Sequence, residues 1–144
     1  VLSWLNPITP VVCLGYLLGR FATLLSGSGY GKPTNLPWGI IYPVGPEAPP
    51  NIAVHPTPIY SILWQSFALV FILFVERRGA AFWKRRGNLF FIYVAWHAIG
   101  RIVVEQFRND YRGAEVLHLS ISTWIALLLI VGALAFLIKN QQKD

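Results

Sequence analysis

The sequence predicts an all-α membrane protein with about four transmembrane helices and one ordered loop rich in glycine and proline. Of its 144 residues, 55% are hydrophobic and only 12% are charged, whereas soluble domains carry about 25% charged residues. Four apolar runs approach the length of roughly 20 residues that crosses the hydrocarbon core of a bilayer. This composition excludes a soluble enzyme, a disulfide-rich secreted domain and a disordered tail, and it predicts a single membrane domain over residues 1–144.

The expected spans cover residues 11–25, 59–75, 89–107 and 117–138. The first begins after Pro10, because proline fits the first turn of a helix, where its missing N–H would have no partner. The residues before it are expected to lead into the membrane along the interface. The fourth span is the clearest, since no charged residue interrupts it.

The basic residues predict how the spans are oriented. They gather in the link between the second and third spans and after the fourth span: Arg77, Arg78, Lys84, Arg85, Arg86, Lys139 and Lys143. Short loops rich in lysine and arginine stay on the cytoplasmic side of a membrane, so this link and the C-terminus are expected in the cytoplasm. Topology alone then explains the net charge of +6, and nucleic acid is not expected as a partner.

The loop expected at residues 26–58 lies on the opposite, external side. It carries most of the ten prolines of the chain together with apolar and aromatic side chains such as Trp38, Ile40 and Tyr42. A flexible linker would not carry so many of them. Irregular backbone at membrane depth must be covered by protein or line a wet cavity, so we expect an ordered re-entrant or interfacial loop.

Ionisable residues inside the spans point to a binding site. Tyr93, His97, Arg101 and Glu105 recur every four residues, which places them along one face of a helix. Arg101 and Glu105 can pair, and such a pair alone could be purely structural. Arg20 adds a second cation, so one positive charge is left over inside the membrane, where charge is costly. Guanidinium groups bind phosphate oxygens well, which predicts a phospholipid headgroup held in a pocket open to the outer leaflet.

His55 lies where the loop meets the second span. The ordinary pKa of histidine, about 6.5, suits a general base, although a loop histidine is more often structural. Cys13 lies in an apolar run and is expected to be inert packing. Neither a metal nor a cofactor is expected.

Several stretches of the chain resemble the prolipoprotein diacylglyceryl transferase family. They are Gly19-Arg20-Phe21, Gly27, Tyr30-Gly31-Lys32-Pro33-Thr34, Leu36-Pro37-Trp38-Gly39, His55-Pro56-Thr57, Tyr60, the segment from Arg101-Ile102-Val103-Val104-Glu105 to Arg108, and Leu119-Ser120. The matches come in family order and cover only the C-terminal half of such an enzyme. Since the sequence also contains no methionine, we expect processing, or an N-terminal half in a longer precursor or a separate chain.

Members of this family move the diacylglyceryl group of phosphatidylglycerol onto the cysteine thiol of a lipoprotein precursor in the bacterial cell membrane. The resemblance implies two groups of site residues. Arg20, Arg101, Tyr60 and Gly31 are predicted to bind the lipid phosphate, and His55 and Glu105 are candidate catalytic residues. His97, which does not match the family, is a third candidate as a substitute base, although a charged imidazole next to Arg101 is disfavoured.

Other positions depart from the family pattern. Ser28 stands in place of a glutamate, Ser61 in place of a second glutamate, and His97 in place of a tyrosine. These departures fall on reaction-centre groups, whereas turn and packing residues are kept. We therefore expect a catalytically silent relative that binds phosphatidylglycerol-like lipid as an accessory subunit of a larger membrane complex. The alternative is an active phosphatidylglycerol–prolipoprotein diacylglyceryl transferase.

Overall fold

The structure, a computed structural model, describes residues 2–42, 49–79, 81–109, 115–116 and 119–142. The helices are α1 (Leu2–Ser26), α2 (Thr57–Arg78), the short α3 (Ala81–Lys84), α4 (Asn88–Glu105) and α5 (Ile121–Gln141), and a small antiparallel pair is formed by β1 (Glu115–Val116) and β2 (Leu119–Ser120). The predicted all-α membrane fold with four long helices is confirmed.

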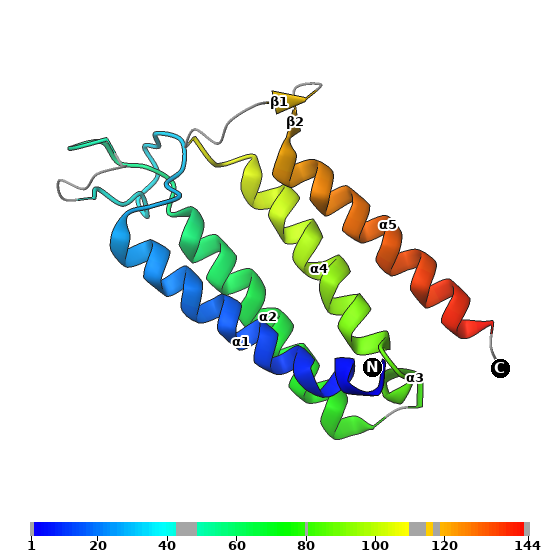
Figure 1. The fold of residues 1–144 in the computed structure, drawn as a ribbon. Coiled ribbons are helices and arrows are strands. Elements are labelled where there is room, and N and C mark those ends of the chain that lie inside the picture. The colour runs from blue at the N-terminus through cyan, green and yellow to red at the C-terminus, as the bar shows by residue number, and fades with distance from the viewer. Residues whose placement is uncertain (1, 43–48, 80, 110–114, 117–118, 143–144) are drawn as a thin grey trace.

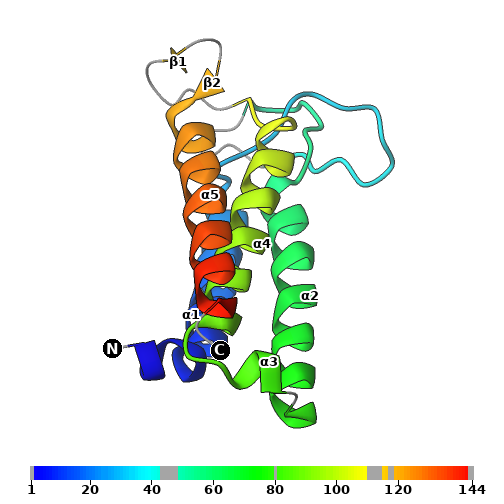
Figure 2. The ribbon, with the colours of Figure 1, turned by 90° about the vertical axis from the view of Figure 1, so that its right-hand side faces the viewer.

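The four long helices form two antiparallel pairs, α1 with α2 and α4 with α5 (Figures 1 and 2). The buried core lies where the pairs meet, and Cys13 of α1, Ala68 and Ile72 of α2, and Leu89 and Tyr93 of α4 contribute to it. The loop between α1 and α2 lies at the end of the bundle where α4 ends and α5 begins (Figure 1). Polar residues near this end of the helices are therefore brought together.

The outer surfaces of the long helices are apolar. Each helix has a segment with a mean hydropathy between 1.2 and 2.6, and large side chains such as Leu128 and Val131 of α5 are 70% and 65% exposed. Such a surface is stable only against hydrocarbon, because a soluble protein of this size rarely exposes large contiguous apolar patches. The chain is a multi-pass membrane protein.

The boundary expected for the first span differs from the observed one. Helix α1 begins at Leu2 and contains both Pro7 and Pro10, so residues 2–10 are helical rather than an extended lead-in. The side chain of Asn6 donates hydrogen bonds to the carbonyl oxygens of Trp83 (3.0 Å) and Arg85 (2.8 Å). These contacts fix the first turns of α1 against the α3 region, which offsets the backbone bonds that the prolines cannot make.

The other spans also shift by a few residues. Helix α2 begins at Thr57, so the loop ends before residue 58. Helix α4 ends at Glu105 rather than 107, because the backbone turns there and the carbonyl of Phe107 accepts from the N–H of Lys32 (2.8 Å). Helix α5 begins after Ser120, whose Oγ caps the N–H of Thr123 (3.3 Å), as serine often does at a helix start. Residues 117–118 of the expected fourth span and Lys143 lie outside the described residues.

The loop between α1 and α2 is ordered over its described residues. Val54 pairs with Ile40 through two backbone hydrogen bonds of 3.0 Å. The same valine is fully buried and forms a small core with Tyr42. The expectation of an ordered loop is therefore confirmed for this part of the chain.

Candidate functional site

Arg101 and Glu105 form the pair that their spacing predicts. Nη2 of Arg101 lies 3.5 Å from Oε2 of Glu105, and the two side chains are 17% and 15% exposed. Oε1 of Glu105 accepts a hydrogen bond from Oγ of Ser122 (3.1 Å). Glu105 therefore connects the arginine on α4 with the first turn of α5.

Arg20 and Arg101 both lie close to His97. The guanidinium carbon of Arg20 stands 4.7 Å from the ring centre of Tyr16, and Tyr16 meets the His97 ring edge-on at 4.5 Å between centroids. Arg101 follows His97 by about one turn of α4 and lines the same small space. Arg20 forms no ion pair within the described part of the chain. Two guanidinium groups and the Glu105 carboxylate therefore leave excess positive charge around this histidine.

Gln65 of α2 completes this cluster, and the sequence interpretation did not include it. Its Nε2 lies 2.6 Å from Nδ1 of His97. The signal was an uncharged but strongly polar side chain inside an apolar span, where such groups need partners. The space between Tyr16, Gln65, His97 and Arg101 measures about 10 Å³. It has room for about one water, so a headgroup phosphate can enter only if side chains move.

His55 and Tyr60 form a second polar group at the loop end of the bundle. Nδ1 of His55 lies 2.9 Å from Oη of Tyr60, and Nε1 of Trp38 donates to the same oxygen (3.0 Å). Together with Phe107 these residues line a cavity of about 360 Å³ whose other walls are apolar. Val104 lines both this cavity and the small space beside Arg101. The two spaces therefore meet at Val104 of α4.

Gly31 lies beside His55 for a structural reason. Its N–H donates to the carbonyl of His55 (3.0 Å), while the N–H of Lys32 donates to the carbonyl of Phe107 (2.8 Å). A Cβ on Gly31 would lie 2.5 Å from Cβ of His55 and 2.7 Å from each of these two carbonyl oxygens. Only glycine fits where these three segments meet. A contact between Gly31 and phosphate stays a prediction.

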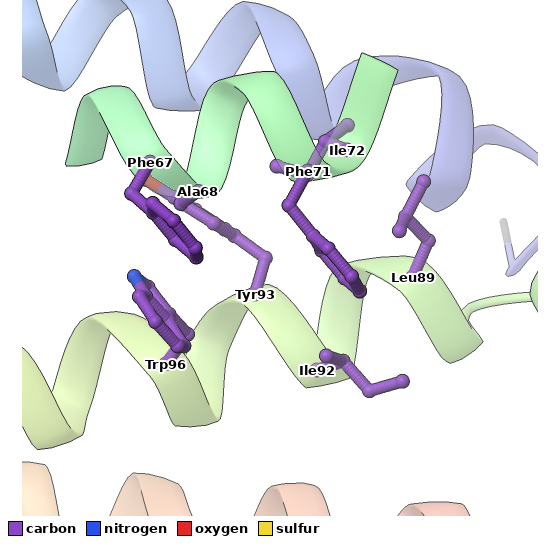
Figure 3. Close-up of a pocket in the computed structure, with 8 residues that line it drawn as sticks. All are labelled: Phe67, Ala68, Phe71, Ile72, Leu89, Ile92, Tyr93 and Trp96. Atoms are coloured by element: carbon purple, nitrogen blue, oxygen red, sulfur yellow. The ribbon is translucent and has the colours of Figure 1, made fainter. Parts of the chain in front are cut away.

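An apolar groove lies along the seam between α2 and α4 (Figure 3). It measures about 230 Å³ and is lined by Phe67, Ala68, Phe71, Ile72, Leu89, Ile92, Tyr93 and Trp96. Trp96 stacks on Trp64 with 4.5 Å between ring centres, and Trp64 also lines the space beside Arg101. The stacked indoles of Trp64 and Trp96 therefore stand between the space beside Arg101 and the apolar groove.

Comparison with known proteins identifies the family of this chain. The family model described as prolipoprotein diacylglyceryl transferase matches residues 1–139. A phosphatidylglycerol–prolipoprotein diacylglyceryl transferase of Clostridium tetani is 38% identical over 145 residues, which cover 100% of this chain and 56% of the relative. Two others, from Frankia alni and Clostridium perfringens, are 34% and 32% identical; the matches cover 90% and 99% of this chain and 33% and 54% of those relatives. The chain thus spans about half the length of the C. tetani and C. perfringens relatives and about a third of the F. alni relative. This chain belongs to the prolipoprotein diacylglyceryl transferase family.

Proposed function

We propose that this chain supplies the headgroup site and the reacting side chains of an enzyme that transfers diacylglyceryl from phosphatidylglycerol to a cysteine thiol of a lipoprotein precursor. One observation carries the proposal: Arg101 lines the same space as His97, and Arg20 stacks on Tyr16, which contacts the His97 ring; among the described residues of this cluster Glu105 is the only carboxylate. A lipid phosphate is an anion that balances this charge and reaches this depth. The similar enzymes named above act on phosphatidylglycerol by name, which supports the same substrate here.

The proposed reaction is a displacement at carbon. The thiolate sulfur attacks the methylene carbon that joins the diacylglyceryl group to the phosphate. A carbon–sulfur bond forms, the carbon–oxygen bond breaks, and glycerol phosphate leaves with the bonding electron pair. The thiol proton passes to a base. Arg20 and Arg101 stabilise the charge that grows on the departing phosphate oxygen, which is often the largest contribution to such catalysis.

His55 is the base in this proposal. If Nδ1–H of His55 donates to Oη of Tyr60, the lone pair of Nε2 is free to accept the thiol proton. The Tyr60 oxygen can accept this bond and the bond from Trp38 together, because a hydroxyl oxygen has two acceptor positions. Tyr60 then orients the imidazole, as the third member of a nucleophile–base–orienter set does.

A phospholipid-binding accessory role without transfer is the second candidate. His97 in place of the family tyrosine favours it. Ser28 and Ser61 in place of family glutamates favour it as well. In this role the chain would bind the headgroup as a subunit of a larger membrane complex.

We further propose that the C-terminus lies in the cytoplasm and that the loop end of the bundle meets the outer leaflet. The basic residues Arg77 and Arg78 lie in the last turn of α2, at the end opposite the loop, and Lys139 lies in the last turn of α5. The orientation can be tested in intact cells: a cysteine at Asn35 should react with a membrane-impermeant maleimide, and one at Gln141 should not.

Transfer of labelled diacylglyceryl to a lipobox peptide tests the proposed function. The full protein would be reconstituted in phosphatidylglycerol proteoliposomes. Arg101→Ala should lower the rate about 100- to 1,000-fold, the usual cost of losing one charge-stabilising donor. Arg78→Ala is the control, since that guanidinium stacks on Phe74 at the other end of α2. Lipid binding without transfer would favour the accessory role, and an Arg101→Ala variant as active as the control would refute the transferase proposal.

A further inference from the structure

Three polar side chains from three helices form a connected row that ends at His97. The Sγ atom of Cys13 on α1 lies 3.4 Å from the backbone carbonyl oxygen and 3.8 Å from Oε1 of Gln65 on α2. Nε2 of Gln65 in turn lies 2.6 Å from Nδ1 of His97 on α4. Cys13 and Gln65 are 0% and 2% exposed, so water does not compete for these contacts.

The orientation of the Gln65 amide decides which nitrogen of His97 carries the proton. Oε1 of Gln65 lies on the side of the Cys13 thiol, 3.8 Å from Sγ, and a thiol can donate to such an oxygen. The NH₂ group, which can only donate, then faces His97. Nδ1 of His97 must therefore accept this bond, and the neutral ring carries its proton on Nε2. The partner of one ring nitrogen sets the protonation of the other.

The two histidines of the site differ in this respect. His55 is bonded to the hydroxyl of Tyr60, which can donate or accept, so either neutral form of His55 is allowed. His97 is bonded to an amide NH₂ and is restricted to the form with Nε2–H. A ring held in that form offers a donor to an anion and has no free lone pair to take a proton from a thiol.

We propose that Gln65 is a positioning residue that holds His97 as an Nε2–H donor for the phosphate of the bound phospholipid. His97 lines the same small space as Arg101, and Arg20 stacks on Tyr16, which meets the His97 ring edge-on, so its N–H adds a neutral donor close to two cationic ones. This inference rests on the proposed function. It divides the two candidate catalytic histidines into an anion donor, His97, and a base, His55.

The protonation of His97 can be observed directly by nitrogen NMR. The chain has three histidines, so histidine labelled with ¹⁵N gives few signals, and a His55→Asn variant helps to assign them. In nanodiscs of phosphatidylcholine we expect the His97 ring to carry its proton on Nε2. Addition of phosphatidylglycerol should shift this Nε2 signal. A ring protonated on Nδ1, or a signal that phosphatidylglycerol leaves unchanged, would overturn the proposal.

Variants test the role of Gln65 itself. In Gln65→Leu the His97 ring should become a mixture of both neutral forms. KM for phosphatidylglycerol should rise about tenfold, the size expected when a hydrogen bond to a charged group is lost, while kcat changes less than about twofold. His97→Gln retains an N–H donor and should restore KM to within about threefold of wild type, whereas His97→Phe should not. Gln106→Leu, an exposed glutamine at the end of α4, is the matched control.

The outcomes separate this inference from the function on which it rests. If Gln65→Leu fails to fold, the NMR titration and the two His97 variants still decide. An unchanged KM in His97→Phe would overturn the donor role. If phosphatidylglycerol shifts the His97 signal but neither the wild type nor any variant transfers diacylglyceryl, the donor role stands and the transferase proposal fails.

Discussion

Replacement of Gly31 by alanine should undock the loop from the helices that carry the candidate site. The added Cβ would lie 2.5 Å from Cβ of His55 and 2.7 Å from the carbonyl oxygens of His55 and Phe107. None of these atoms belongs to a flexible side-chain end, so no rotamer change relieves the clash. The loop backbone must therefore move away from the start of α2 and from the end of α4.

The magnitude follows from the hydrogen bonds at this junction. The displacement breaks the bonds from Gly31 N–H to His55 O (3.0 Å), from Lys32 N–H to Phe107 O (2.8 Å) and from His55 N–H to Lys32 O (3.0 Å). Each bond contributes about 0.5–1.5 kcal/mol, so losing two or three costs about 2–4 kcal/mol. For a chain of this size the melting temperature should then fall by roughly 5–15 °C.

Two measurements on detergent-solubilised protein check this prediction: thermal unfolding, and hydrogen exchange of the backbone amides between α1 and α2. The control is Gly19→Ala, where an added Cβ meets no atom within 4 Å. It should keep the wild-type melting temperature. A Gly31→Ala variant with unchanged melting temperature and protected loop amides would refute the reasoning.

Three further predictions concern the site and its supports. Tyr60→Phe removes the hydroxyl that orients His55, so kcat for diacylglyceryl transfer should fall about ten- to 100-fold with little change in KM. Gly100→Ala would place a Cβ 2.4 Å from Nε1 of Trp64, which should lower the melting temperature by about 5 °C or more through overpacking. Burial raises the pKa of Tyr42. The contribution of this tyrosine to stability should therefore be complete below its ordinary pKa of about 10 and be lost as the pH rises further. In melting curves between pH 8 and 11, Tyr42→Phe should remove this loss of stability.

Each of these predictions has a specific control or a contrary outcome. If Trp38→Phe lowers kcat as much as Tyr60→Phe does, the hydrogen-bond network around the Tyr60 hydroxyl controls the rate, and not its bond to His55. Gly132→Ala, where an added Cβ meets no atom within 4 Å, should melt like the wild type. The hydroxyl of Tyr42 is buried without a hydrogen-bond partner among the described residues, so a large destabilisation by Tyr42→Phe near neutral pH would contradict the structure.

Hydropathy was sufficient to predict the four long helices, because a bilayer selects length and apolarity and little else. The pairing of Arg101 with Glu105 also followed from the sequence, since residues four apart on one helix are neighbours. The start of α1 did not follow. Pro7 and Pro10 are strong signals for a helix boundary in isolation, but the hydrogen bonds from Asn6 to the distant α3 region stabilise the helix through them.

Contacts between helices were the part that the sequence could not predict. The contact between Gln65 and His97 joins residues 32 apart in the chain, and it depends on how α2 packs against α4. Polarity alone marked Gln65 as unusual, but not its partner. The bond between His55 and Tyr60 was within reach, because five residues separate them at the start of a helix. The glycine at 31 was identified from the family resemblance, and its steric reason became visible only in three dimensions.

The junction around Gly31 has a consequence for how this protein can diverge. Its hydrogen bonds use main-chain groups, which nearly every amino acid carries, so the side chains of residues 32–34 can be exchanged without loosening it. A deletion or insertion of one residue is a different kind of change, because it shifts the amide of Lys32 away from the carbonyl of Phe107 and turns neighbouring side chains to the opposite face. Over evolutionary time this segment should therefore tolerate drift in composition while its length stays fixed.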